Sequence, residues 1–206
     1  MDFQEAVRYT GGGTLDEWRS AIQLQLQLLQ DAGLTPQASI LEIGAGCLGL
    51  AHKLVEYLAP GNYTGIEPHV EVAQAGNGLN PSRAPVLLHR EDFDPTESGR
   101  TFDIVFAHSV LTHVAGAQLG QFLRNVKPHL RPNGFILASL RWGKDTNASQ
   151  WTYPGAVWFS SPTVQQVASQ EGFLVEVHDE MRLTCEAALP RMFHDWVVFR
   201  PFDPTR

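Results

Sequence analysis

The chain has 206 residues, of which 43% are hydrophobic and 10% aromatic, a length and composition that suit one globular domain with a full core. Its 15 basic and 22 acidic side chains give a formal net charge of −7, and no basic run is present, which argues against nucleic acid as a partner. No apolar stretch reaches membrane-spanning length and no signal-peptide pattern is visible, so we expect a soluble, cytoplasmic protein with no membrane partner.

The first long helix is predicted to begin after Thr14, because Thr14 and Glu17 form a capping box. Gly33 and Pro36 end it. Its apolar side chains recur on one helical face: Leu15, Trp18, Ile22, Leu26 and Leu29. We interpret residues 1–38 as an N-terminal arm and helix that cover the active site, and residues 39–206 as the main domain.

From residue 39 onward, short apolar runs alternate with helical patterns. Strands are predicted at Ile40, Tyr63 and Val86, and over Phe102–Ala107, Phe135–Leu140, Phe173–His178 and Trp196–Phe199; helices are predicted over Leu48–Leu58, Val70–Ala75, Ala117–Leu130 and from Ser161 to Glu171. Because the strand runs are continuously apolar, they indicate a parallel sheet buried on both faces. The sequence therefore predicts a single-domain α/β fold.

A glycine-rich turn joins the first of these strands to its helix. The segment reads S-I-L-E-I-G-A-G-C-L-G-L over Ser39–Leu50, and Gly44, Gly46 and Gly49 have the spacing G-x-G-x-x-G. Such a turn lets a ligand approach the backbone closely and lets a helix pack tightly on its strand. Alone, this spacing is shared by several cofactor-binding folds.

Charged side chains at the strand ends narrow the choice of cofactor. Glu42, Glu67, Asp92 and His108 lie at or near the ends of four predicted strands, where ligands bind in open parallel sheets. Carboxylates there suit a cofactor with an ammonium group and a ribose diol. A nicotinamide dinucleotide shares the glycine spacing, but Glu42 would repel its pyrophosphate, so a nicotinamide-dependent oxidoreductase is the weaker interpretation.

Together these motifs resemble the class I S-adenosylmethionine (SAM)-dependent methyltransferases over roughly residues 39–200. In that family the segment like L-E-I-G-A-G holds the methionine part of SAM through its backbone, which implicates Gly44, Ala45, Gly46 and Gly49, with Glu42 beside them. The segments Y-T-G-I-E and E-D-F are similar to the ribose and adenine motifs, so the resemblance implies that Glu67 binds the ribose hydroxyls, Asp92 the adenine amine and Phe93 the adenine ring.

Two further segments extend the resemblance. F-D-I-V-F-A-H-S-V-L-T-H-V, over Phe102–Val114, is similar to the fourth-strand motif that floors the active site, with His108 beside the cofactor. L-R-P-N-G-F-I-L, over Leu130–Leu137, is similar to the family's fifth strand. The resemblance implies a Rossmann-like, doubly wound and mostly parallel seven-stranded sheet with an antiparallel last strand.

Methyl transfer needs a base only when the acceptor atom is protonated. For a hydroxyl acceptor His113 is the first candidate and His108 the second, since imidazole titrates near working pH. The aromatic and histidine side chains expected at the rim as substrate-binding residues are Tyr9, Trp18, Trp151, Tyr153 and His194. No metal site is expected, because Cys47 and Cys185 have no metal-type spacing.

The sequence thus predicts methyl transfer from SAM to a small-molecule acceptor. Oxygen is favoured over nitrogen because Ala107-His108-Ser109-Val110 stands where methyltransferases of adenine or glutamine nitrogens carry an Asn-Pro-Pro-Tyr type motif. A looser similarity, carried by P-G-N-Y-T-G-I-E-P and S-V-L-T-H-V, points to bacterial enzymes of glycan or secondary-metabolite clusters. A cofactor-binding regulatory or non-catalytic module stays open, as does a monomer or a homodimer.

Overall fold

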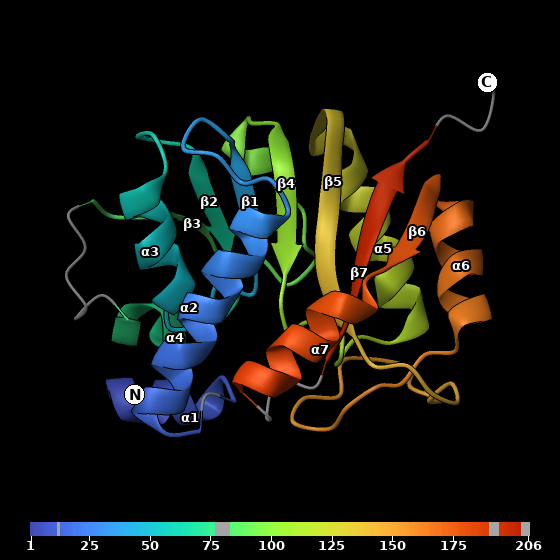
Figure 1. Ribbon diagram of the computed structural model, residues 1–206, viewed down its shortest axis with the longest axis horizontal. Coiled ribbons are helices and arrows are strands. Elements are labelled where there is room, and N and C mark those ends of the chain that lie inside the picture. The colour runs from blue at the N-terminus through green and yellow to red at the C-terminus, as the bar shows by residue number, and fades with distance from the viewer. Residues whose placement is uncertain (12, 77–82, 190–193, 203–206) are drawn as a thin grey trace.

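The computed structural model describes residues 1–11, 13–76, 83–189 and 194–202, which fold around one seven-stranded sheet (Figure 1). The strands are β1 (Ile40–Ile43), β2 (Tyr63–Ile66), β3 (Val86–Leu88), β4 (Phe102–Ala107), β5 (Leu130–Leu140), β6 (Phe173–Val177) and β7 (Asp195–Pro201). Their order is β3-β2-β1-β4-β5-β7-β6, and only β7 runs antiparallel to its neighbours. The predicted mostly parallel sheet with an antiparallel last strand is confirmed.

Helices cover both faces of the sheet. They are α1 (Phe3–Tyr9), α2 (Leu15–Asp31), α3 (Gly49–Tyr57), α4 (Val70–Gly76), α5 (Gly116–Val126), α6 (Ser161–Gln170) and α7 (Asp179–Ala188), with short 3₁₀ turns η2 (Thr96–Ser98) and η3 (Lys127–His129). One core contains side chains of α2, α3 and α7, and the other contains side chains of α5 and α6. In Figure 1, α2, α3 and α7 lie on the near face. None of the helices in the described ranges is long and apolar enough to cross a membrane.

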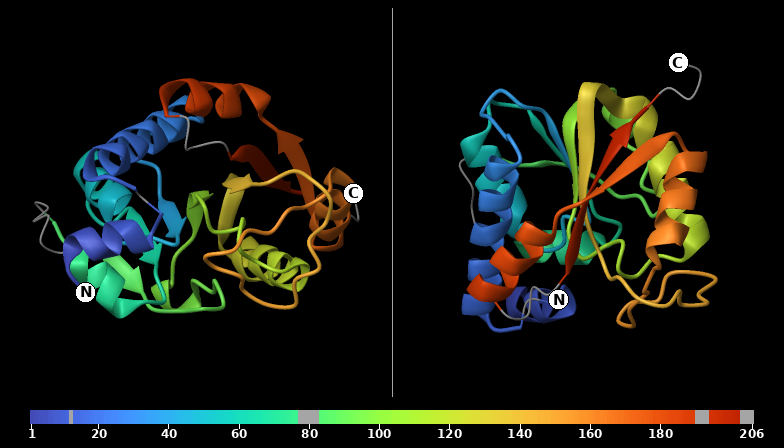
Figure 2. Two further views of the ribbon diagram at one scale, coloured as in Figure 1. Left: turned by 90° about the horizontal axis from the view of Figure 1, so that it is seen from below. Right: turned by 45° about the vertical axis from the view of Figure 1, so that its right-hand side comes forward.

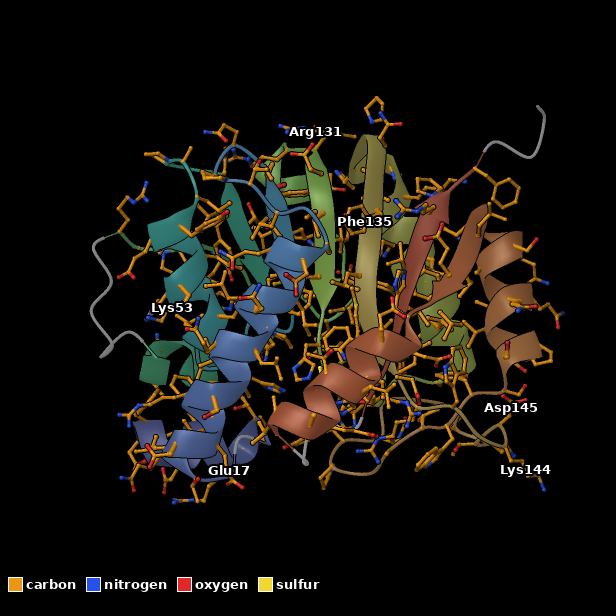
Figure 3. The ribbon with its side chains drawn as sticks, in the orientation of Figure 1. Glu17, Lys53, Arg131, Phe135, Lys144 and Asp145 are labelled. Carbon is orange, nitrogen blue, oxygen red and sulfur yellow. The ribbon has the colours of Figure 1, made fainter. Side chains whose placement is uncertain are left out.

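The strand order places a switch point between β1 and β4. The chain leaves β1 outward through β2 to β3 and then returns to add β4 on the other side of β1. A crevice opens at the carboxyl ends of the strands where the direction of winding changes. Figure 2, which includes a view from that end, shows α1 and the long connection after β5 on either side of the strand ends. Figure 3 shows Glu17, at the start of α2, at the same end as Lys144 and Asp145 and opposite to Arg131.

The predicted boundaries need three corrections. The N-terminal arm contains α1, whose first turn is closed by a capping box between Asp2 and Glu5. A further helix, α7, lies between β6 and β7, where no element was predicted. The strand predicted to begin at Phe135 begins at Leu130, where β5 pairs irregularly with β4, and the helix predicted to end at Leu130 ends at Val126.

Helix α2 shares its core with the sheet. Its capping box is present as predicted, because the Thr14 hydroxyl accepts a hydrogen bond from the Glu17 N–H and the Glu17 carboxylate accepts one from the Thr14 N–H. Ile22 and Leu29 pack in one cluster with Ile40 of β1. Residues 1–38 therefore contribute to the core as well as to the end of the sheet where the crevice lies.

Candidate active site

A cavity of about 780 Å³ occupies the crevice at the carboxyl ends of the strands. Its volume lies within the usual range for small-molecule and cofactor sites, roughly 300–1,000 Å³. All the predicted site residues except Asp92 line it: Tyr9, Trp18, Glu42, Gly44, Ala45, Gly46, Gly49, Glu67, Phe93, His108, His113, Trp151, Tyr153 and His194. The fold therefore gathers side chains from a span of nearly the whole chain around one space.

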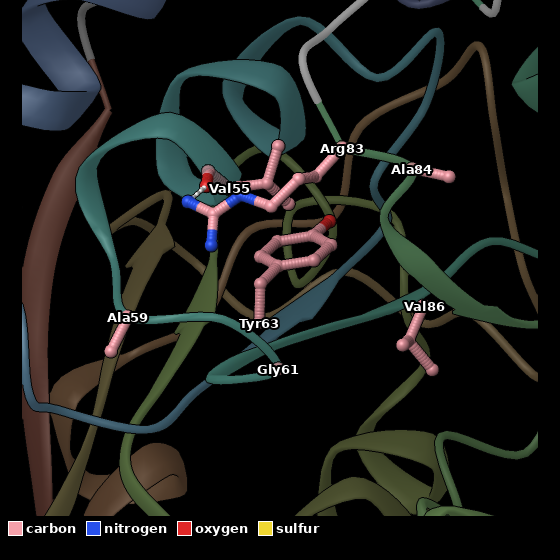
Figure 4. A pocket seen from close by; sticks show the side chains of 7 residues that line it. All are labelled: Val55, Ala59, Gly61, Tyr63, Arg83, Ala84 and Val86. Atoms are coloured by element: carbon pink, nitrogen blue, oxygen red, sulfur yellow. Dashed lines mark hydrogen bonds between the residues drawn. The ribbon is translucent and has the colours of Figure 1, made fainter.

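A second hollow, of about 40 Å³, lies between the end of α3 and the starts of β2 and β3 (Figure 4). Arg83 donates hydrogen bonds there to the carbonyls of Val55 and Leu58, so its guanidinium closes the carboxyl end of α3. This hollow is too small for a cofactor, and Arg83 has a structural role in it.

The glycine turn follows β1 at the edge of the large cavity. Gly44 and Gly46 have positive φ angles of 74° and 53°, which favour glycine. A Cβ on Gly44 would lie 2.4 Å from Val110 Cγ2, so the loop after β4 packs directly on this turn. A Cβ on Gly49 would lie 2.2 Å from Ile22 and 2.4 Å from Trp18, which assigns the third glycine to the contact of α3 with α2.

Glu67 joins the end of β2 to the glycine turn. Its side chain is 6% exposed, and its two carboxylate oxygens accept hydrogen bonds from the N–H groups of Gly46 (2.9 Å) and His69 (3.0 Å). Burial raises the pKa of Glu67, and these two N–H groups oppose the rise. The carboxylate is held in one orientation at the cavity wall, where it can accept further hydrogen bonds.

Glu42 is buried within β1 and pairs with a tyrosine that the sequence did not single out. The Tyr63 hydroxyl donates to Glu42 Oε2 at 2.7 Å, and both side chains are at most 5% exposed. Burial raises the pKa of Glu42 to about 7, while the Tyr63 hydrogen bond lowers it. A Cβ on Gly65 would lie 2.5 Å from the Tyr63 oxygen, so this glycine makes room for the phenol to reach across β2.

Asp92, predicted to bind adenine, does not line the cavity. Arg90 donates two hydrogen bonds to its carboxylate, at 2.9 and 2.6 Å, and this guanidinium lowers the pKa of Asp92. The neighbouring Glu91 and Phe93 line the cavity instead. Phe93 packs edge-on against Phe122 with ring centroids 5.7 Å apart and so presents a fixed apolar surface.

His113 is fixed in one tautomer by the backbone. Its Nδ1 lies 2.6 Å from the Gly155 carbonyl, which only accepts hydrogen bonds, so Nδ1 carries the hydrogen and a neutral ring has its lone pair on Nε2. Burial lowers the pKa of His113, the hydrogen bond to Gly155 raises it, and the charge of Arg141 lowers it further. His113 is therefore a neutral imidazole at pH 7 in the cavity wall.

His108 lies in an aromatic stack at the end of β4. Its ring is stacked on Trp196 at 5.5 Å and meets the His194 ring edge-on at 5.2 Å. Burial, with His194 adding to it, lowers the pKa of His108 well below its usual range, and its Nε2 is buried without a hydrogen-bond partner among the described residues. His108 therefore suits a neutral cavity wall better than proton transfer through that nitrogen.

Three of the five predicted rim residues, Tyr9, Trp151 and Tyr153, form a chain of ring contacts with His113. Tyr153 donates a hydrogen bond to the carbonyl of Tyr9, and its ring lies 5.4 Å from that of Tyr9 and 4.9 Å from that of His113. Trp151 contacts His113 at 5.5 Å, with the tryptophan 43% exposed. The segment after β5 and the N-terminal helix thus meet over the cavity.

Arg141 and His69 are two of the cavity residues that sequence reasoning missed. Arg141 directly follows β5, lines the cavity and lies over the Trp158 ring, with Cζ 5.4 Å from the centroid. His69 follows Glu67 and contacts the Tyr9 ring at 5.8 Å. Their positions in the sequence could have indicated them, because both follow the end of a predicted strand, as the predicted site residues do. No three histidine, cysteine or acidic side chains within the described part of the chain are grouped to hold a metal ion.

Comparisons with known proteins found one family match and many similar structures. Residues 41–136 match the family model described as a methyltransferase domain. DhpI in its SAH complex is 17% identical with a TM-score of 0.65, covering 97% of this chain and 93% of its own. DesVI of Streptomyces venezuelae is 16% identical with a TM-score of 0.67, and the match covers 98% of this chain and 99% of DesVI. Magnesium protoporphyrin IX methyltransferase of Synechocystis PCC 6803 with bound SAM is 12% identical with a TM-score of 0.60, and the match covers 96% of this chain and 81% of that enzyme. No curated protein matches by sequence.

The matched segment contains the glycine turn, Glu42, Glu67 and the whole of β4. The structural likenesses extend the same fold over almost the entire chain. Residues 41–136 are therefore similar to a methyltransferase domain, and the whole chain has the fold of these SAH- and SAM-bound structures.

Proposed function

We propose that this chain is a class I SAM-dependent methyltransferase and that it methylates a hydroxyl group of a small-molecule acceptor. The observation that carries the proposal is the hydrogen bond between His113 Nδ1 and the Gly155 carbonyl, 2.6 Å long. It leaves Nε2 of a neutral His113 as a proton acceptor in the cavity wall. A hydroxyl acceptor needs such a base, whereas an amine that arrives deprotonated does not.

The cavity fits SAM at the end formed by β1, β2 and the loop after β3. Glu67 is oriented there by two backbone N–H groups, and Glu42 and Glu91 lie in the same wall. We assign Glu67 to the ribose hydroxyls, Glu42 to the ammonium group, the glycine turn to the methionine backbone and Phe93 to the adenine ring. When bound, SAM supplies an electrophilic methyl group on a positively charged sulfur.

The enzyme's own residues then orient the acceptor and remove its proton. Tyr153, Trp151 and Tyr9 enclose the space beside His113 and reduce its contact with water, which strengthens electrostatic interactions inside it. His113 Nε2 takes the hydroxyl proton, and the Gly155 carbonyl stabilises the imidazolium that results. Holding the acceptor in line with the methyl group accounts for the remaining rate.

Two measurements test this proposal. Mass spectrometry of the purified protein is expected to detect co-purified SAM or SAH, and calorimetry is expected to detect SAH binding. A screen of small alcohols, phenols and amines with SAM is then expected to yield SAH with hydroxylic acceptors. Turnover confined to amines would refute oxygen methylation, and SAH binding without turnover on any acceptor would favour a non-catalytic module. That the acceptor is a small molecule is a prediction. That the protein is a monomer or a homodimer is a prediction as well.

A further inference from the structure

The cavity wall has a division of charge between its two ends. Three of its four acidic side chains, Glu42, Glu67 and Glu91, lie in or just after β1, β2 and β3. The fourth, Glu17, belongs to the capping box of α2. Two arginines line the described wall. Arg90 lies after β3, where Asp92 and Glu97 pair with it, and Arg141 lies at the other end, directly after β5.

The histidines on this side leave Arg141 as the fixed charge. Burial lowers the pKa of His194 to about 4, with Arg141 and His113 adding to the effect. Burial also lowers the pKa values of His108 and His113. All three rings are neutral at pH 7, whereas an arginine keeps its charge at any working pH.

The position of Arg141 suits recognition of an anion. Its guanidinium lies over the Trp158 ring, 5.4 Å from the centroid, which supports the planar group from one side. A guanidinium at a cavity wall forms strong, two-pronged hydrogen-bonded pairs with carboxylate and phosphoryl groups. Arg141 lines the same cavity as His113 and His194, and its charge lowers the pKa values of both rings.

We infer that the acceptor is a small hydroxylic molecule with an anionic group, a carboxylate or a phosphoryl group, which Arg141 binds while the hydroxyl faces His113. This inference rests on the proposed function. The aromatic side chains of Trp151 and Tyr153 then contact the body of the acceptor between the two groups.

The test uses the full-length protein loaded with SAH and a matched pair of probes, 4-hydroxybenzoate and 4-hydroxybenzamide, which share a shape and differ in charge. Calorimetry is expected to show binding of the carboxylate and roughly 10- to 100-fold weaker binding of the amide, the range for hydrogen bonds to a charged partner. Arg141→Gln is expected to abolish this preference and Arg141→Lys to restore part of it. Inorganic phosphate is expected to displace the carboxylate if the site accepts phosphoryl oxygens and to leave it bound if it accepts carboxylates only.

Lys144→Gln is the control, because it removes an exposed positive charge from the same connection, three residues along. It is expected to leave the preference unchanged. SAH affinity, measured separately in each variant, distinguishes the two proposals: wild-type protein that fails to bind SAH contradicts the proposed function itself. If SAH binds but the carboxylate does not bind or has no advantage over the amide, the anionic acceptor is refuted. If Arg141→Gln weakens SAH instead, Arg141 serves the cofactor and the inference is likewise refuted.

Discussion

The two ends of the cavity differ in how their polar groups are held. At the end formed by β1, β2 and the loop after β3, carboxylates are fixed by donors: Glu67 by two backbone N–H groups and Glu42 by the Tyr63 hydroxyl. At the end formed by β4, β5 and β7, histidines are buried among aromatic rings and stay neutral. One end is built to hold negative charge toward a cationic ligand, and the other to supply a neutral base beside a fixed positive charge.

This difference shows what each half of the fold contributes. The acids lie at the ends of adjacent parallel strands, so the sheet itself fixes their spacing. The histidine end depends on segments outside the parallel strands, since Gly155, Trp151 and Tyr153 all lie in the connection between β5 and α6. We expect substitutions at the first end to change cofactor affinity, and substitutions at the second end to change turnover.

The largest expected effect is the loss of the base. His113→Ala should lower kcat by roughly 10²-fold or more with a hydroxylic acceptor, the usual contribution of general-base catalysis, while SAH affinity stays within about twofold. Because the pKa of His113 is lowered, the wild-type rate should stay level from pH 8 down to pH 7 and fall only below the ordinary histidine pKa, as the ring gains a proton.

His129→Ala is the matched control, since His129 also contacts a backbone carbonyl through Nδ1, that of Arg100, but does so away from the cavity. Its rate should equal that of the wild type. A wild-type rate for His113→Ala together with a slow His108→Ala would move the base to the end of β4.

The next effect concerns Glu42 and stability. Its pKa rises from 4.5 to about 7 on burial, so between these pH values the unfolded chain loses a proton that the folded protein keeps, and stability falls as pH rises. Glu42→Gln removes this pH-dependent decrease in the free energy of unfolding, which is on the order of 3 kcal/mol above pH 7. Its Tm without cofactor should therefore exceed the wild-type Tm by several degrees at pH 8 and match it at pH 4, while its SAH affinity falls.

Differential scanning calorimetry at the two pH values measures the Glu42 effect. The exposed Glu56→Gln, on α3, removes a carboxylate without burial and should show no pH-dependent gain. An equal Tm for Glu42→Gln and wild type at pH 8 would mean that Glu42 is ionised in the folded protein at little cost.

Glu67→Ala tests the cofactor end directly. SAH affinity should fall by about 1–3 kcal/mol, the range for hydrogen bonds to a charged group, as measured by calorimetry. Glu71→Ala, which removes an exposed carboxylate on the adjacent helix α4, should leave it unchanged. Unaltered SAH affinity in Glu67→Ala would refute its assignment to the ribose.

Much of this arrangement could be predicted because it depends on local sequence. Apolar runs indicate the seven strands, and the glycine turn with Glu42 and Glu67 marks the cofactor end from sequence alone. The short helix α1 was missed although its Asp2–Glu5 capping box is visible in the sequence. Helix α7 has charged residues at its start and only Cys185 buried, so its apolar pattern is weak.

Two features of the site escape sequence reasoning: which side chains face inward after a strand end, and which distant segments come into contact. Asp92 and Glu91 follow a strand end, where alternation no longer determines which side chain faces inward, and Arg90 engages Asp92. The tautomer of His113 depends on a carbonyl 42 residues away, and the environment of Glu42 depends on a tyrosine 21 residues away. No local pattern encodes such pairs, so they require the folded chain.

The pair of Tyr63 and Glu42 gives the smallest effect and the finest test of the cofactor end. Tyr63→Phe removes one buried hydroxyl and should weaken SAH binding by about three- to tenfold, the effect of one lost hydrogen bond. Because this hydroxyl lowers the pKa of Glu42, its loss should also raise that pKa, so the pH at which SAH affinity reaches half its maximum should move upward.

Tyr57→Phe is the control, since the Tyr57 hydroxyl donates to the Leu34 carbonyl at 3.1 Å, away from the cavity. Calorimetric titrations of SAH from pH 6 to pH 9 distinguish the two roles of Tyr63. A fall in affinity that is equal at every pH would make Tyr63 a packing residue, whereas a shifted profile would make it the residue that orients Glu42 and sets its charge.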